Sequence, residues 1–452
     1  MSVLGFESKK EGENVFVGTI KLSDNMMLFR LDDYKLTISN TEGQYIDWDD
    51  IKAIINDRWI KLEDFSKNGI YAYIEAVEYL NGYEYKCDLQ FYVVDWYRKD
   101  KKNTLEYDHI WIKSDCLDYY FRDDIKYKSD ILNLINCCNC KEINDEGVEQ
   151  NTVEIDAFNQ KLLIEFKTMI QGSDKPFPYD VRNVMIFGVS KTSDQELLYN
   201  VIRMAKTFLK FISVNSKVDI INPVMIGSGD DINNYTAMLY IKPDNVEHIN
   251  PNRCLKYDDT KSGLAKLLTM ICQNEICFRS LFPCNMNKIT YADIMNICAA
   301  FELQFDVSVI HNYKYKEQEK VKKKIIKIIE DSRETQFSDA EKIYCNEIIA
   351  GIKNVKETLK KRIDIVLQEF IRIYGELNIK CDFEEDYVNM PERIKNSRNA
   401  LDHGNVEYKF ERIMYWDAEL LRAMVYMLIL KTAGISDEKI FNSIKKLSKY
   451  PV

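Results

Sequence analysis

The chain has 452 residues, 46% hydrophobic and 12% aromatic, so it can bury large cores and is not intrinsically disordered. This length exceeds what a single hydrophobic core usually serves, and we therefore expect several domains. The formal net charge of −10 argues against a broad basic surface for nucleic acid. The acidic excess lies before Met286, and acidic and basic residues nearly balance beyond it.

The cysteine usage and the hydropathy pattern predict a cytoplasmic protein. The first sixteen residues contain no apolar run of the kind that directs export, so we expect the twelve cysteines to be reduced. The densest group, at positions 137, 138 and 140, lacks the second pair that a zinc site needs. We therefore expect no metal and no cofactor. No apolar segment is long enough to span a bilayer, so we expect no membrane partner.

Residues 1–140 are predicted to form a β-rich domain. Short runs of aromatic and β-branched residues alternate with polar ones and are separated by turn-forming residues. The pair Asn81-Gly82 lies between two such runs and is the clearest hairpin signal in the chain. We expect a sandwich or a barrel-like sheet.

Two further domains are predicted to follow. Residues 153–284 alternate extended runs with one helical segment, 195–214, and are predicted to be an α+β domain. Residues 288–452 are predicted to be all-helical, with Ser338 as an N-cap and Pro391 in the first turn of a late helix. The whole chain is thus predicted to be a multidomain α+β protein with a C-terminal helical bundle.

One short segment of this bundle carries residues suited to catalysis. Arg398 is followed directly by Asn399 and, five positions on, by His403, near the expected end of a helix. On an ideal helix, residues five apart point about 140° apart, so Arg398 and His403 do not share a face. Asn399 and His403 do. Two copies of the segment that meet across a two-fold axis would bring both side-chain types into one cleft.

This motif, late in a helical bundle, resembles the signature of HEPN-domain ribonucleases. The segment around Glu302, on the long first helix, is similar to the opening helix of the ApeA-like HEPN group. The resemblance implies that a β-rich region precedes the HEPN domain and that the protein serves bacterial phage defence. It also implies a homodimer or a higher even oligomer, and an N-terminal region that senses a phage-derived trigger and restrains the nuclease.

The residue types fit RNA cleavage that needs no metal. An imidazole such as that of His403 can take the proton of the 2′-hydroxyl or protonate the leaving 5′-oxygen. The guanidinium of Arg398 can stabilise charge on the phosphorane, and Asn399 can orient the imidazole or hold a phosphate oxygen. We expect an RNA substrate, tRNA foremost, and products with 2′,3′-cyclic phosphate and 5′-hydroxyl ends. Arg393, Lys395 and Glu302 are weaker candidates for contact with the RNA or support of the site.

Simpler interpretations exist for each of these residues. Arg398 and Asp402 lie four apart and could form a surface ion pair, and His403 could interact with the helix dipole. Glu302 could be a charged residue at a helix edge. At the level of function, the rival hypothesis is a non-catalytic protein whose helical bundle dimerises and whose sheet domains bind a ligand. A nucleotide-binding partner of another enzyme is a third hypothesis, which the intact Arg-Asn-x3-His motif disfavours.

Overall fold

The computed structural model describes most of the chain. The described residues are 15–22, 25–40, 46, 52, 56–81, 83–95, 105–121, 151–172, 179–228, 235–244, 246, 249–276, 281, 290–308, 310, 316–354, 358–383, 386–402 and 411–447. They fall into two compact units. The first contains Met1–Asp118, Asp124–Lys206 and Lys217–His248, and the second contains Tyr119–Asp123, Thr207–Ser216 and Ile249–Val452. The predicted three-domain division stays a prediction.

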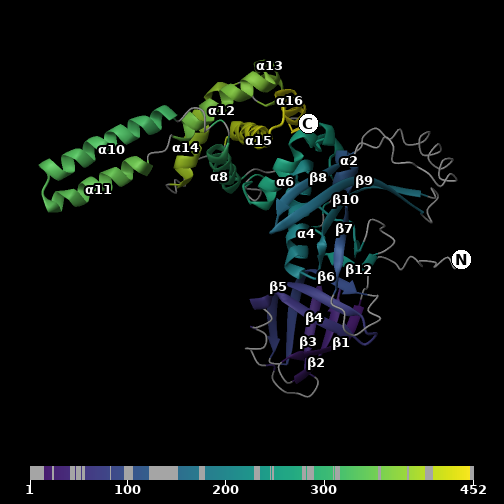
Figure 1. The fold of residues 1–452 in the computed structure, drawn as a ribbon. Coiled ribbons are helices and arrows are strands. Elements are labelled where there is room, and N and C mark those ends of the chain that lie inside the picture. The colour runs from purple at the N-terminus through teal and green to yellow at the C-terminus, as the bar shows by residue number, and fades with distance from the viewer. Residues whose placement is uncertain are drawn as a thin grey trace. The chain divides into compact units, whose positions relative to one another are not determined.

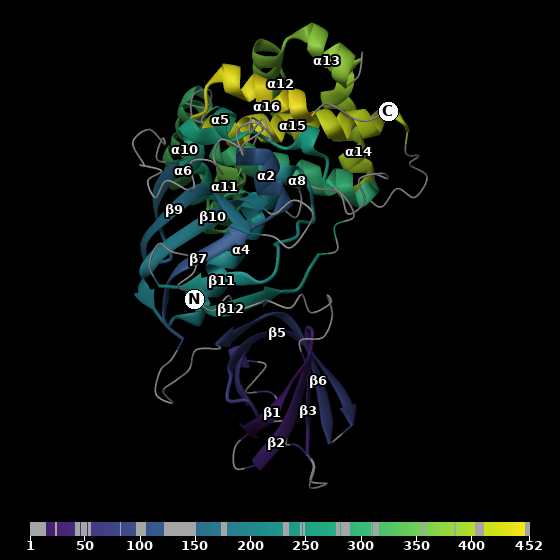
Figure 2. The ribbon, with the colours of Figure 1, turned by 90° about the vertical axis from the view of Figure 1, so that its right-hand side faces the viewer.

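The first unit is built on one twelve-stranded sheet (Figures 1 and 2). Its strands are β1 (Val15–Leu22), β2 (Asn25–Asp32), β3 (Lys35–Ser39), β4 (Trp59–Asp64), β5 (Gly69–Asn81), β6 (Glu84–Asp95), β7 (Tyr107–Lys113), β8 (Thr152–Ala157), β9 (Gln160–Gly172), β10 (Tyr179–Thr192), β11 (Val224–Gly227) and β12 (Tyr235–Ile241). The helices α2 (Asp115–Phe121) and α4 (Gln195–Ser213) also belong to this stretch of the sequence.

Strands β1 to β6 close into a barrel. Their order is β3-β2-β1-β4-β5-β6, and β3 pairs again with β6, with Lys35 opposite Asp88 and Ser39 opposite Glu84. Alternate residues of these strands point inward, as in β1, and form one hydrophobic cluster. The predicted β-rich region with a barrel-like sheet is thus confirmed. Strands β5 and β6 pair as the predicted hairpin, with Asn81 opposite Glu84; Gly82 lies outside the described residues.

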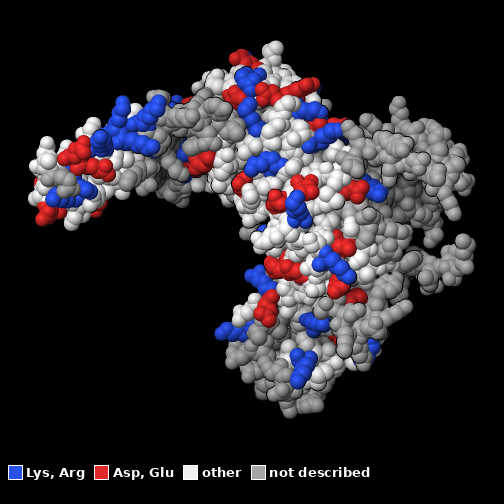
Figure 3. All heavy atoms as spheres, viewed as in Figure 1, with Lys and Arg blue, Asp and Glu red and all other residues white. Residues whose placement is uncertain are grey.

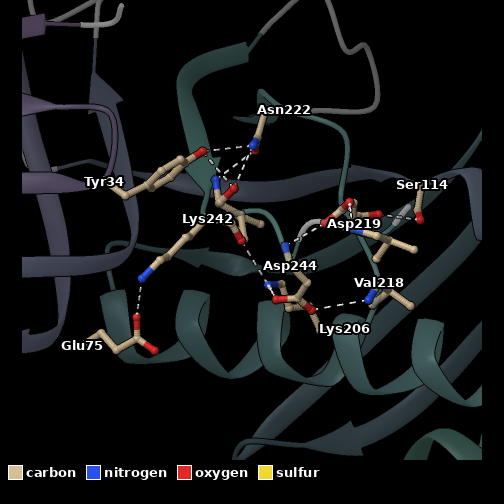
Figure 4. Close-up of polar contacts among 11 residues, drawn as sticks. Tyr34, Glu75, Ser114, Lys206, Val218, Asp219, Asn222, Lys242 and Asp244 are labelled. Atoms are coloured by element: carbon tan, nitrogen blue, oxygen red, sulfur yellow. Dashed lines mark hydrogen bonds and ion pairs between the residues drawn. The ribbon is translucent and has the colours of Figure 1, made fainter. Parts of the chain in front are cut away.

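A polar network joins the barrel to the rest of the sheet (Figure 4). The Tyr34 hydroxyl donates a hydrogen bond to the carbonyl oxygen of Ile241 on β12, 2.9 Å away. The Asn222 side chain bonds the same carbonyl and the Tyr34 hydroxyl, and it accepts from the Ile241 amide. Burial raises the pKa of Tyr34 to about 12, so the phenol stays protonated at any physiological pH. The Asp219 carboxylate accepts bonds from the amides of Asp244 and Val246 and fixes the chain that follows β12.

The second unit contains a helical bundle, as predicted for residues 288–452. Its described helices are α5 (Tyr257–Thr260), α6 (Leu264–Cys272), α8 (Tyr291–Val307), α10 (Lys316–Gln336), α11 (Asp339–Asn354), α12 (Leu359–Tyr374), α13 (Glu376–Asp382), α14 (Met390–Asp402), α15 (Ile413–Thr432) and α16 (Asp437–Leu447). Pro391 lies in the first turn of α14, where the missing amide proton costs nothing. Ser338 directly precedes α11, and its amide and hydroxyl both donate to Glu341, as expected of an N-cap.

Helix α15 forms the centre of the bundle. Its residues from Ala418 to Leu430 are all buried, and α8 packs along it. The buried Arg422 within this apolar segment pairs with Glu419 one turn earlier, which compensates the charge. No helix in the described part of the chain is long and apolar enough to cross a membrane.

Candidate active site

The predicted site residues that the structure describes lie on two helices of the second unit, α8 and α14. A side-chain N-cap and capping box start α8: the Thr290 hydroxyl accepts from the Asp293 amide, and the Asp293 carboxylate accepts from the Thr290 amide. This places Glu302 in the fourth turn of a helix with a capped N-terminus. Helix α14 carries Arg398 and Asn399 in its last turns and ends at Asp402, the residue before His403.

The structure brings Glu302 and Arg398 together. Nη2 of Arg398 lies 3.6 Å from Oε2 of Glu302, and the two side chains are 36% and 33% exposed. The carboxylate holds the guanidinium from one side, while about a third of the Arg398 side chain is open to solvent. A guanidinium with several donors can keep one such partner and still bind a phosphate oxygen. Glu302, the weaker candidate from the sequence, therefore lies in direct ionic contact with the predicted catalytic arginine.

A second ion pair fixes α8 one turn after Glu302. The buried Arg362 of α12 places Nη1 3.1 Å from Oδ1 of Asp306, and its guanidinium lies over the Phe305 ring at 5.2 Å. No sequence pattern pairs these two charged residues, which lie far apart in the chain. The contact matters for the site because Asp306 is four positions from Glu302, on the same side of α8. The backbone that presents Glu302 is thus braced against α12.

Arg393 has an anchoring position on α14. Its guanidinium donates to both carboxylate oxygens of Asp417, and also to the side chain and the carbonyl of Asp386. Asp417 lies on α15, and its side chain is only 1% exposed. The hydrogen bond to Asp417 raises the pKa of Arg393, which stays charged. These contacts join α14 to α15 and favour a structural role for Arg393; its predicted contact with RNA remains a prediction.

Lys395 lies on a charged face of α14. Its ammonium donates to Oε1 of Glu392, 3.0 Å away, and Lys360 of α12 lies 3.5 Å from Oε2 of the same carboxylate. The hydrogen bond from Lys395 lowers the pKa of Glu392. Two lysines thus share one carboxylate nearly two turns before Arg398, which leaves a local positive excess. Lys395 keeps enough exposure to meet a phosphate.

Asn399 and His403 complete the predicted catalytic set. Asn399 is exposed on α14, next to Arg398. His403 lies outside the described residues, so its distance from Arg398 is not part of this geometry. Among the residues that the structure describes, no group of three or more His, Cys, Asp or Glu side chains could hold a metal ion.

The comparison with protein families bears on this helical region. Residues 296–439 match the family model described as Apea-like HEPN. This part of the chain is an Apea-like HEPN domain. The match runs from α8 into the start of α16 and includes Glu302, Arg398 and His403. No curated protein and no solved structure matches the chain.

The family assignment gives the site its general chemistry. HEPN domains are generally ribonucleases, and nuclease or defence functions are typical of them. The suspected family membership is therefore confirmed for this domain. Glu302, on the first helix of the domain, and Arg398, on the helix that carries the motif, contact each other at the surface of the domain.

Proposed function

We propose that this protein is an endoribonuclease of anti-phage defence that cuts tRNA or another cellular RNA without a metal ion. The observation that supports this most directly is the Glu302–Arg398 ion pair inside an Apea-like HEPN domain. It holds the partly exposed guanidinium of Arg398 in place, on the helix that precedes His403.

The chemistry follows from the residue types. His403 takes the proton of the ribose 2′-hydroxyl, or protonates the leaving 5′-oxygen, because an imidazole titrates near neutral pH. The 2′-oxygen then attacks the phosphorus, and the bond from phosphorus to the 5′-oxygen breaks. Arg398 stabilises the negative charge that develops on the phosphorane oxygens. The products are a 2′,3′-cyclic phosphate and a 5′-hydroxyl.

The site is proposed to work as a pair across a homodimer or a higher even oligomer. Arg398 and His403 are five positions apart and would not share a face if α14 continued through His403, so one copy alone would present them in different directions. A two-fold axis places two copies of the motif in one cleft. The first unit is proposed to restrain the nuclease until a phage-derived trigger binds, in the cytoplasm of the infected cell.

The decisive experiment compares RNA ends after induction of the native protein, His403→Ala and Arg398→Ala. We expect cyclic-phosphate ends at defined sites with the native protein only, and unchanged cleavage by the purified protein in EDTA. Arg30→Ala serves as the control for loss of an arginine, since Arg30 is an exposed residue of β2 that pairs with the nearby Asp32. If both site variants kept the full biological effect, the protein would instead be a non-catalytic, dimerising binding protein.

A further inference from the structure

Two lysines beside the candidate active site, Lys360 of α12 and Lys395 of α14, are here called the lysine pair. Both contact the carboxylate of Glu392. Nζ of Lys395 lies 3.0 Å from Oε1 of this carboxylate, and Nζ of Lys360 lies 3.5 Å from Oε2. The side chains of Lys395, Lys360 and Glu392 are 37%, 45% and 44% exposed. Each carboxylate oxygen thus has one ammonium group beside it, in a contact that is open to solvent.

The lysine pair lies on the same side of α14 as Arg398. Lys395 and Arg398 are three positions apart, which is about 60° around the helix and about 4.5 Å along its axis. Side chains at this spacing are neighbours on a helix surface. A polymer strand that passes Arg398 along this side of α14 therefore meets Lys395 one turn away.

Lys360 starts from a fixed part of α12. Leu359, directly before it, is buried, and the buried Arg362, two positions after it, pairs with Asp306 of α8 at 3.1 Å. These contacts hold the first turn of α12 against the bundle. The place of the Lys360 ammonium group therefore does not depend on its contact with Glu392 alone.

The charges at the lysine pair do not cancel. Among the described residues, two ammonium groups share one carboxylate here, which leaves one positive charge in excess. The neighbouring arginines are compensated, Arg362 by Asp306 and Arg393 by Asp417. Figure 3 shows that basic side chains also gather over α10, with acidic ones farther along that helix, but the candidate site lies on α8 and α14. The lysine pair combines an excess of positive charge with a place beside Arg398.

We propose that the lysine pair binds a phosphate of the RNA substrate next to the phosphate that is cleaved, and that the Glu392 carboxylate occupies this place when RNA is absent. The ligand follows from the proposed nuclease, on which this inference rests, because the strand that Arg398 engages continues past Lys395. Carboxylate and phosphate oxygens both accept hydrogen bonds from ammonium groups, so a phosphate can replace the carboxylate on the same two donors. Such contacts fix the register of a strand without reading its sequence.

The test measures binding of a labelled oligouridylate by fluorescence anisotropy at a series of salt concentrations. Every chain carries His403→Ala, so that the RNA stays intact. Lys360→Ala and Lys395→Ala should each weaken binding about fivefold at about 0.1 M salt and reduce the slope of log affinity against log salt by about 0.7, the value for one phosphate contact on a single strand. Lys380→Ala, at an exposed position of α13, is the matched control and should change neither quantity.

Removal of the carboxylate tests the role of Glu392. Glu392→Gln should bind the oligouridylate about twofold to fivefold more tightly, the range of one exposed ion pair, because the phosphate no longer has to displace a carboxylate. Glu376→Gln, on α13, corrects for the change in net charge. If the three residues only joined α12 to α14, Glu392→Gln would bind like Glu376→Gln and melt at a lower temperature. That result would overturn the displacement by phosphate.

Kinetics with the intact histidine separate the lysine pair from the proposed nuclease. Lys360→Ala and Lys395→Ala should raise KM and leave kcat close to the native value, since a distant phosphate is held equally in the ground state and the transition state. If the native protein cleaves RNA while both variants bind and cleave like Lys380→Ala, the role of the lysine pair is overturned and the nuclease stands. An oligouridylate that fails to bind at low salt also overturns it. Weaker binding by the lysine variants, with no cleavage by the native protein, would overturn the nuclease alone. Circular dichroism melts verify that each variant folds.

Discussion

We propose that the carboxylate of Glu302, which contacts Arg398, has a positioning role in the candidate site. An ion pair between partly exposed side chains contributes at most about 1 kcal/mol to stability, so its loss does not endanger the fold. The reaction rate is far more sensitive than stability to loss of the group that holds a catalytic guanidinium, since small misplacements slow reactions by about tenfold to a hundredfold. The two effects can be separated by experiment.

For Glu302→Gln we therefore expect a fall in kcat for RNA cleavage of about tenfold to a hundredfold, with little change in KM. The thermal unfolding midpoint should stay close to that of the native protein. Glu438→Gln, at an exposed position of α16, is the control that loses the same charge elsewhere in the domain. A Glu302→Gln variant that cleaves at the native rate would exclude Glu302 from the site.

Arg393 differs from Glu302: it is a candidate site residue, but its contacts indicate a structural role. In Arg393→Ala the buried carboxylate of Asp417 would lose its partner, and removal of one member of a buried pair costs about 3–5 kcal/mol. We expect a clear fall in the denaturation midpoint, measured by circular dichroism. Lys395→Ala on the same helix should leave the midpoint nearly unchanged. If Arg393→Ala melted like the native protein but bound RNA more weakly, Arg393 would be a phosphate contact.

The sequence could predict the motif residues but not the contacts that they make. Arg398, Asn399 and His403 lie within six positions, so their spacing is visible in the primary structure. Glu302 and Arg398 meet only because α8 and α14 both pack in the bundle that α15 centres, and no local pattern encodes that contact. The Arg362–Asp306 and Arg393–Asp417 pairs escaped prediction for the same reason: each charge sits in an ordinary helical pattern, and only tertiary packing selects its partner.

At the scale of elements, a charged cluster joins the ends of three helices. Glu369 of α12 accepts hydrogen bonds from Arg372, which also pairs with Asp437 of α16, and Lys431 of α15 contacts both carboxylates. The Arg372 hydrogen bonds, together with Lys431, lower the pKa of Glu369 to about 2. The pKa in the unfolded chain is close to 4.5, the ordinary value. The stabilisation is therefore complete above about pH 4.5 and is lost as the pH falls toward 2.

We expect Glu369→Gln to reduce the free energy of unfolding at pH 6 by about 1 kcal/mol, a figure that allows for solvent screening of the partly exposed cluster. The difference from the native protein should shrink as the pH is lowered through the range from 4.5 to 2. Urea denaturation at a series of pH values measures it. Glu376→Gln, at an exposed position of α13, is the control. A difference that does not change with pH would show that the cluster does not stabilise the helices through its charge.

Most elements were predictable because their periodicity is local. The helix 195–214 is observed as Gln195–Ser213, and the described residues of the long segment after Thr290 include the helices α8 and α10. Strand β4, Trp59–Asp64, shows the same alternation, with every second residue buried. The strand pairing that closes the barrel could not be predicted. It joins β3 to β6, which no turn connects.

At the scale of the whole molecule, the proposed composite site predicts complementation between two inactive variants. A mixture of Arg398→Ala and His403→Ala chains should regain part of the cleavage activity, because a mixed pair holds one intact arginine and one intact histidine on different copies. Each variant alone should stay inactive. Cleavage assays after co-expression measure the effect, with Arg398→Ala plus a chain carrying both substitutions as the control. If the mixture remained inactive, one copy would supply both groups.

The strand pairing of β6 makes the N-terminal barrel difficult to isolate. Its residues Glu84 to Asp88 pair with β3, and along the same edge Phe91 to Val94 pair with β12, which comes from much later in the sequence. A fragment that stops near residue 140 would keep the pairs between β3 and β6 that close the barrel, but it would lose the pairs between β6 and β12. It would then present a short row of unsatisfied amides and carbonyls, the kind of template on which foreign strands add and aggregates grow. Proteolysis should for that reason yield no clean, soluble barrel.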